Sequence, residues 1–266
     1  MTPGVAVDSG PVRREVAHLM GMPISLALRG RHADTTTGRR AWSAFIARLR
    51  RVDQVFSTYR EDSVISRLGR GELTQAQCPA EVLEVLDLGR AAEEQSGGAF
   101  SVWLPDGRGG TRLEPSGVVK GWAIQRASRH LAALDDTDWC VSAGGDMVCH
   151  VADPDRPDWR IGVEHPLDPT RVIAVIPVRT GAVATSGTAH RGQHLIDART
   201  GRPATGVASV TVTGPSLTWA DIDATAAYVQ GAVAAEWLRT RAGRSALVVW
   251  PDATTTIIDG RLPSGW

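Results

Sequence analysis

Apolar residues recur at helical spacing in several segments of the chain. The clearest segment runs from Gly38 to Val52, where polar residues separate the apolar positions of one face: Ala41, Phe45, Leu49 and Val52. This pattern predicts an amphipathic helix. A second helix is predicted over residues 79–96, because Pro79 suits a first turn and Gly97 suits a C-terminal cap. Three later segments also favour helices: residues 123–131, 218–230 and 232–241.

Short segments that favour strands separate or precede these helices; residues 12–18 and 24–28 alternate apolar and polar positions, and residues 246–249 are apolar throughout. They cover residues 12–18, 24–28, 139–142, 147–151, 159–164, 171–178, 182–187, 195–197, 209–213, 246–249 and 254–258. Turns such as Gly144-Gly145-Asp146 join neighbouring segments, so an antiparallel meander is expected. Strands and helices alternate only loosely. This order predicts an α+β fold with a mainly antiparallel sheet flanked by helices, and not a doubly wound sheet.

The length of 266 residues allows a sizeable core within one domain. We expect a single domain over residues 12–262, which can comprise two lobes. Residues 1–11 are rich in Gly and Pro and are expected to form a flexible N-terminus.

The composition argues against several classes of function. Basic and acidic residues are balanced at 29 each, so no nucleic-acid partner is expected. No apolar run reaches the ~18 residues of a membrane span, and the N-terminus lacks the pattern of a signal peptide. A cytoplasmic protein is therefore expected. The spacing of Cys78, Cys140 and Cys149 fits no zinc motif, and we expect three buried thiols.

Asp221 and Thr225 are candidate metal-binding residues. They lie four positions apart in a predicted helix, so their oxygen atoms share one face. A hard cation such as Mg²⁺ needs few protein ligands when phosphates and waters complete its shell. The competing interpretation is a capping box, in which Thr218 caps the helix and Asp221 is its third residue. Asp223 should point away from this face into solvent.

His190 and His194 lie in a glycine-containing stretch that does not favour a helix. Either imidazole can act as a general base, because imidazole titrates near neutral pH. For His190 an ordinary surface or core role explains the residue better. Asp197 follows an apolar pair and can either orient His194 or anchor a turn.

Two other features admit two interpretations each. The Gly-rich turn over residues 116–121 can bind a phosphate through backbone N–H groups at a helix start, or it can allow close packing. Tyr59 is expected to be a half-buried aromatic residue on its chemistry alone.

A series of motifs, in a fixed order, resembles the flavin transferases of the ApbE type. The motifs are MGMPISL, FSTYREDSVISRL, SGGAF, SGVVKGWAI, VSAGGD, AVATSG, HLIDARTGRPA, SVTVTGPS and WADIDATAAYVQG. They extend from about Met20 to Trp250. The resemblance implies an Mg²⁺-dependent enzyme that transfers FMN from FAD onto a Thr or Ser hydroxyl of a target protein and releases AMP.

The resemblance also implies roles for individual residues. Those expected to contact FAD are Met20, Tyr59, Ala99, Phe100, Ser101, Glu114, Lys120 and Ile196. Those expected to hold the metal are Asp221, Thr225 and the backbone carbonyl of Gly117. His194 is expected to be the base for the acceptor hydroxyl, and Asp221 is expected to serve as both helix cap and catalytic metal ligand.

The chain departs from the family pattern in one region. Ser101 and Glu114 both stand where the family usually has Asp, and the connection between them is shorter than the usual insert. A more open flavin site, or one covered by a partner chain, would follow. Two rival functions therefore stay open: hydrolysis of FAD to FMN and AMP, and flavin binding without catalysis.

Overall fold

The computed structural model describes residues 12–187 and 195–260. Its largest feature is an eight-stranded sheet in which all neighbouring strands are antiparallel. In spatial order the strands are β1 (Arg13–Leu19), β2 (Met22–Gly30), β5 (Thr137–Ala143), β6 (Asp146–His150), β9 (Gly181–Gly187), β12 (Ser209–Gly214), β13 (Ser245–Val249) and β14 (Thr255–Ile258). The predicted α+β class with a mainly antiparallel sheet is confirmed.

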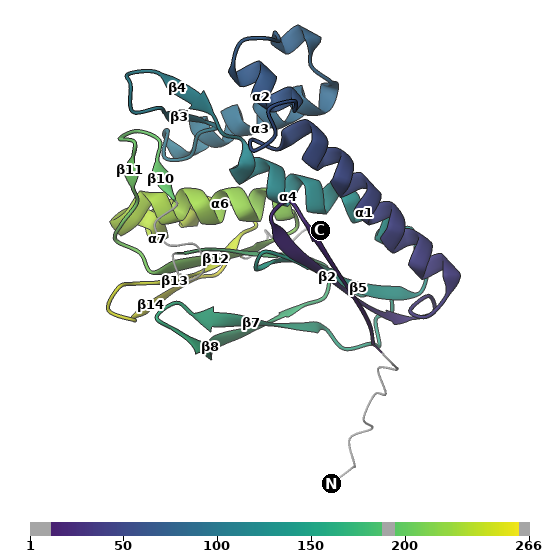
Figure 1. Cartoon of the computed structure of the whole chain (residues 1–266). Coiled ribbons are helices and arrows are strands. Elements are labelled where there is room, and N and C mark those ends of the chain that lie inside the picture. Colours follow the sequence, from purple (N-terminus) through teal and green to yellow (C-terminus); the bar gives the residue numbers. More distant parts are fainter. Residues whose placement is uncertain (1–11, 188–194, 261–266) are drawn as a thin grey trace.

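Helices cover one face of this sheet (Figure 1). The main ones are α1 (Thr36–Phe56), α4 (Ser116–Ala127), α6 (Leu217–Gln230) and α7 (Ala234–Arg239). The core lies between the two layers and includes fully buried side chains from both: Ile24, Phe45, Leu49, Ile124, Val141, Val210 and Ile222. The alternation along each strand directs one set of side chains toward the helices, which is the usual means of closing such a core.

Smaller elements extend this arrangement. They are α2 (Val64–Gly69), a 3₁₀ turn (Gln75–Gln77), α3 (Ala80–Ser96), the hairpin of β3 (Trp103–Pro105) and β4 (Thr111–Leu113), α5 (Arg129–Ala132), the hairpin of β10 (Ile196–Asp197) and β11 (Arg202–Pro203), and a 3₁₀ turn (Gly231–Val233). Among the described helices, none combines the length and the apolar character that a membrane crossing requires.

A separate hairpin, β7 (Trp159–His165) and β8 (Asp168–Val178), lies against the other face of the sheet (Figure 1). It contributes to a second, smaller apolar cluster whose buried members are Cys149, Ile161, Val178 and Val183. The large sheet is therefore covered on both faces, by helices on one and by this hairpin on part of the other.

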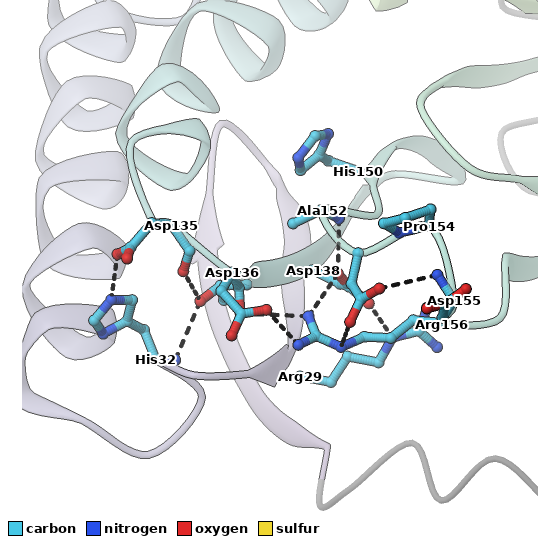
Figure 2. A network of polar contacts seen from close by, with 12 residues as sticks. Arg29, His32, Asp135, Asp136, Asp138, His150, Ala152, Pro154, Asp155 and Arg156 are labelled. Carbon is cyan, nitrogen blue, oxygen red and sulfur yellow. Dashed lines mark hydrogen bonds and ion pairs between the residues drawn. The ribbon is translucent and has the colours of Figure 1, made fainter.

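Ion pairs and hydrogen bonds hold the segment between β6 and β7, which leads into this hairpin, against β2 and β5 (Figure 2). Arg29 donates to Asp138 over 2.7 Å, and its guanidinium lies 4.3 Å from the ring centre of Trp159. The other Asp138 oxygen accepts from the backbone N–H of Ala152 at 2.8 Å and from Arg156 at 3.2 Å. Burial opposes the charge of Asp138, but these donors hold its pKa below the usual value.

Most predicted elements are present, with three instructive differences. The helices predicted over 38–52 and 79–96 are α1 and α3, and Gly97 caps α3 in the left-handed region with φ 61°. The predicted Gly-rich turn over 116–121 is instead helical, because α4 begins at Ser116. The short connection between Ser101 and Glu114, for which no strand is predicted, contains the β3–β4 hairpin. Of the three cysteines predicted to be buried, only Cys149 is; Cys78 and Cys140 are partly exposed.

Candidate functional site

Helices α4 and α6 approach closely at a glycine. A Cβ atom placed on Gly121 would lie 2.9 Å from the carbonyl oxygen of Leu217 and 3.1 Å from the Cβ of Asp221. Any larger side chain would push the helices apart. This contact brings the residue before Gly121, Lys120, beside Asp221.

Lys120 joins carboxylates from two elements into one buried cluster. Its Nζ lies 2.5 Å from Oδ2 of Asp146 on β6 and 3.2 Å from Oδ1 of Asp221 on α6. The side chains of Lys120, Asp146 and Asp221 are 19%, 1% and 3% exposed. One ammonium and two carboxylates leave a net negative charge when all three are ionised, which is costly in a dry environment.

The pKa values of Asp221 and Lys120 reflect this excess of negative charge and their burial. Burial raises the pKa of Asp221 to about 7, and the negative charge of Asp146 adds to that effect while Lys120 opposes it. Burial alone would lower the pKa of Lys120, but the two carboxylates outweigh burial and hold that pKa above its usual value. Among the described residues, no group donates a hydrogen bond to Oδ2 of Asp221. When all three groups are ionised, the cluster therefore lacks one positive charge for electrical neutrality.

Two neighbouring residues of β9 contact the cluster and the next turn of α6, one through its backbone N–H and one through its hydroxyl. The backbone N–H of Thr185 donates to Oδ1 of Asp146 at 3.1 Å. The hydroxyls of Ser186 and Thr225 lie 3.1 Å apart. Thr225 follows Asp221 by one helical turn, so the predicted metal-binding pair shares one face of α6.

These groups suit a hard cation better than a soft one. Within residues 12–187 and 195–260, no three His, Cys, Asp or Glu side chains are grouped to hold a metal ion. The site instead offers two carboxylates and a threonine hydroxyl, and one carboxylate oxygen lacks a hydrogen-bond donor. Mg²⁺ accepts such an incomplete set of oxygen ligands when waters and phosphates supply the rest. The residues therefore fit a magnesium ion.

Gly117, the third predicted metal contact, lies in the first turn of α4. It packs against Phe100, because a Cβ on Gly117 would be 3.0 Å from that ring. Ala99 and Phe100 are both buried in the main core. The predicted Ala99-Phe100 segment and Gly117 thus lie together at the start of α4, and one turn later the Gly121 N–H helps to stabilise the charged form of Asp221.

The remaining predicted flavin contacts have local partners of their own. Ser101 donates to Oε2 of Glu93 at 2.7 Å, and Arg112 pairs with Glu114 at 2.8 Å. Ile196 is half-buried in β10. Their roles toward FAD stay predictions.

Two predicted flavin contacts come from loops. Met20 lies in the tight β1–β2 turn with φ 54°, followed by Gly21 with φ 71°, and is partly buried against the core. Two successive positive φ values are typical of such hairpin turns. Tyr59 is 98% exposed, so the half-buried interpretation is wrong. Nothing in the described fold uses its ring, which leaves the ring available for a ligand.

Two predictions about α6 are wrong. The helix cap is Ser216, whose side chain accepts from Trp219 N, whereas Thr218 donates to Gln125 at 3.0 Å. Asp221 is therefore not a capping residue. Asp223 is 1% exposed and binds Arg241 and Arg244 at 3.0 Å each, instead of facing solvent. The sequence pattern of α6 does not indicate the partners of Asp223, because Arg241 and Arg244 lie beyond the end of that helix.

Two other predicted residues have different outcomes. Asp197 anchors its turn, since its carboxylate accepts from the backbone N–H and the guanidinium of Arg199 at 2.9 Å. His194 lies outside the described residues, as does His190. Their proposed use as a base stays a prediction.

Asp146 is the site residue that sequence reasoning assigned only to a turn. The signal was an acidic residue directly after Gly144-Gly145, at the start of a strand whose next positions are apolar. Its partner on β5, Ala143, is fully buried. A carboxylate at such a position requires a buried partner, and Lys120, the single lysine of the chain, provides it.

Comparison with known proteins places the chain in a family. A family model described as the ApbE family matches residues 20–106 and 103–248. An FAD:protein FMN transferase of Vibrio cholerae is 33% identical over 129 residues, which are 45% of this chain and 39% of that protein. One of Treponema pallidum is 31% identical over 173 residues, or 56% and 48%. The chain thus aligns with less than half the length of these relatives.

Solved structures share the fold over a larger part of the chain. The ApbE protein of Thermotoga maritima superposes with a TM-score of 0.79 at 21% identity, covering 94% of this chain and 97% of that one. The flavin transferase ApbE of Vibrio cholerae gives 0.77 at 20% identity, covering 94% and 98%. The family model matches most of the sequence and these structures match its fold, so the chain belongs to the ApbE family.

Proposed function

We propose that the chain is an Mg²⁺-dependent FAD:protein FMN transferase that attaches FMN through a phosphoester to a Thr or Ser of a target protein. The observation that carries the proposal is the buried cluster of Lys120, Asp146 and Asp221, with its carboxylate oxygen that lacks a donor. The names of the relatives support the same activity.

Three groups of the chain would hold the metal: the Asp221 carboxylate, the Thr225 hydroxyl and the Gly117 carbonyl. Asp146 would balance charge nearby. Bound Mg²⁺ would neutralise negative charge on the FAD diphosphate. Without a cation the ionised cluster carries net negative charge and would repel that diphosphate, so cofactor and substrate binding should depend on each other.

The side chains around the cluster have separate tasks in this proposal. The Lys120 ammonium would bind a phosphate oxygen while remaining close to its carboxylates. The exposed ring of Tyr59 would stack on the flavin or adenine ring. Transfer forms a bond between the FMN phosphorus and the acceptor hydroxyl oxygen, and breaks the diphosphate bond so that AMP leaves. His194 would accept the hydroxyl proton.

An incubation with FAD, Mg²⁺ and a peptide containing one acceptor threonine tests the proposal. We expect the mass of FMN bound as a phosphoester on the peptide, together with release of AMP. Controls are the same peptide with alanine for threonine, and excess EDTA. AMP release without a peptide adduct would instead indicate hydrolysis of FAD, and tight FAD binding without AMP would indicate a binding module.

A further inference from the structure

Cys140 and Cys149 face each other across two neighbouring strands of the large sheet. They are register partners in the β5–β6 pair, and Sγ of Cys149 donates to Sγ of Cys140 over 3.1 Å. Side chains of directly opposed residues have Cβ atoms about 4.5–5.5 Å apart, and a disulfide needs about 3.5–4.5 Å. A small inward movement would therefore bring the two sulfurs to bonding distance.

The neighbouring strands place small residues beside the cysteine pair. On the far side of Cys140 the register partner is Ala27 of β2, and on the far side of Cys149 it is Gly181 of β9. Neither residue carries a bulky side chain. Both cysteines belong to the apolar cluster under the β7–β8 hairpin, on the face opposite to Asp146.

The two thiols differ in access. Cys149 is 1% exposed, and its hydrogen bond to Cys140 together with burial raises its pKa. Cys140 is partly exposed. A dissolved oxidant should therefore meet Cys140 first, and Cys149 is positioned as the second sulfur.

We propose that Cys140 and Cys149 are a dithiol site that forms a reversible cross-strand disulfide with low-molecular-weight disulfides. The Cys140 thiolate attacks one sulfur of the small disulfide, forms a mixed disulfide and releases one small thiol. Cys149 then loses its proton, attacks Sγ of Cys140 and releases the second small thiol. Two protein thiols are oxidised and one small disulfide is reduced.

The disulfide would make the covalent linkage between β5 and β6 depend on the redox state of the solvent, and β6 carries Asp146. Asp146 begins β6 three residues before Cys149, with its side chain on the opposite face. The proposal rests on the two sulfurs alone, and it holds or fails independently of flavin transfer.

Oxidised glutathione as the probe and alkylation under denaturing conditions test the proposal. All three cysteines of the chain should be alkylated in the reduced protein. After oxidation only Cys78 should be alkylated, and a proteolytic fragment should join the peptides of Cys140 and Cys149. Dithiothreitol should restore all three thiols. Full alkylation after oxidation, or a cross-link through Cys78, would overturn the proposal.

Two matched variants test the order of the steps. In Cys149→Ala, the mixed disulfide at Cys140 cannot be resolved, so the mass of one glutathione should remain on Cys140. In Cys140→Ala, the buried Cys149 should stay reduced. Cys78→Ala, which leaves the pair intact, should still form the cross-link. Retention of glutathione on Cys149 in the Cys140→Ala variant would contradict the assigned order.

Discussion

Two buried aspartates of α6 differ in their partners although only one residue separates them. Asp221 faces α4 and shares a single ammonium with Asp146, whereas Asp223 binds two arginines, Arg241 and Arg244. Residues two apart on a helix point about 200° from one another. Asp221 therefore shares one ammonium with a second carboxylate, whereas two guanidinium groups oppose the rise that burial causes in the pKa of Asp223. This difference favours Asp221 over Asp223 as the residue that binds a ligand in the proposed function.

The first prediction uses this difference. Asp221→Asn should keep the fold, because the amide has the same shape and no longer adds a buried negative charge. Its affinity for Mg²⁺ in the presence of FAD should fall by about 10- to 100-fold, as titration calorimetry would measure. FAD-dependent AMP release should fall with it.

Asp223→Asn is the matched control for that experiment. It leaves the guanidinium groups of Arg241 and Arg244 without their carboxylate, so unfolding in urea should require about 2–4 kcal/mol less free energy. Mg²⁺ affinity should change little. A loss of Mg²⁺ affinity in this variant, or none in Asp221→Asn, would refute the assignment of the metal to Asp221.

At the scale of elements, the site depends on how closely α4 packs against α6. Gly121 allows that approach, since a Cβ there would lie within 3.1 Å of two backbone atoms of α6, Leu217 O and Thr218 Cα. Backbone atoms cannot turn aside as a side chain can. The spacing of the two helices therefore sets the position of Lys120 relative to Asp221.

The second prediction is that Gly121→Ala separates these helices. The variant should lose about 1–3 kcal/mol of stability through overpacking, and it should bind FAD and Mg²⁺ more weakly because Lys120 shifts away from Asp221. Gly69→Ala is the control, since its Cβ would be 3.6 Å from Leu113, an ordinary contact. Equal stability of the two variants by urea unfolding would argue against a packing role for Gly121.

Helix positions can be predicted from the sequence where the signals are local, but contacts between distant segments cannot. Periodicity located α1 and α3, because their apolar faces and terminal signals are local in the chain. The cap of α6 was misassigned, since Thr218 is held by Gln125, which lies 93 residues away. The burial of Asp223 and the partner of Asp146 likewise depend on contacts between distant segments. Local patterns contain no information about such partners.

At the scale of the whole molecule, the large sheet and the segment leading into the β7–β8 hairpin are joined through Asp138 (Figure 2). Its lowered folded-state pKa means that its contribution is complete above the unfolded value of about 4. That contribution is lost as pH falls through the lower, folded-state pKa. Acid should therefore loosen this connection.

The third prediction follows from the lowered pKa of Asp138 in the folded state. At pH 7, Asp138→Asn should lower the free energy of unfolding by about 3 kcal/mol, because Arg29 and Arg156 lose a shared buried anion. The difference from the wild-type protein should shrink as pH falls below about 4. Urea titrations at several pH values would measure it. The exposed partner Asp136, changed to Asn, should cost at most about 1 kcal/mol, and a difference for Asp138→Asn that does not vary with pH would contradict the prediction.

The fourth prediction concerns ligand binding and the stability of the domain. The cluster joins β6, α4 and α6, so ligands that bind it should stabilise the cooperative unit as a whole. FAD and Mg²⁺ together, each at about 100 times its Kd, should add about 2.7 kcal/mol or more. For a chain of this size that corresponds to a rise in Tm of about 5–10 °C.

The rise in Tm with FAD alone and the rise with Mg²⁺ alone should add up to less than the rise with both ligands together. FAD alone would bring its diphosphate to a cluster that already carries negative charge, and Mg²⁺ alone would lack the phosphate oxygens that complete its shell. In Asp221→Asn the Mg²⁺-dependent part of the shift should disappear, while any shift from FAD alone should persist. Additive shifts in the wild-type protein would show that the two ligands bind independently, and they would contradict the proposed dependence of FAD binding on the charge of the cluster.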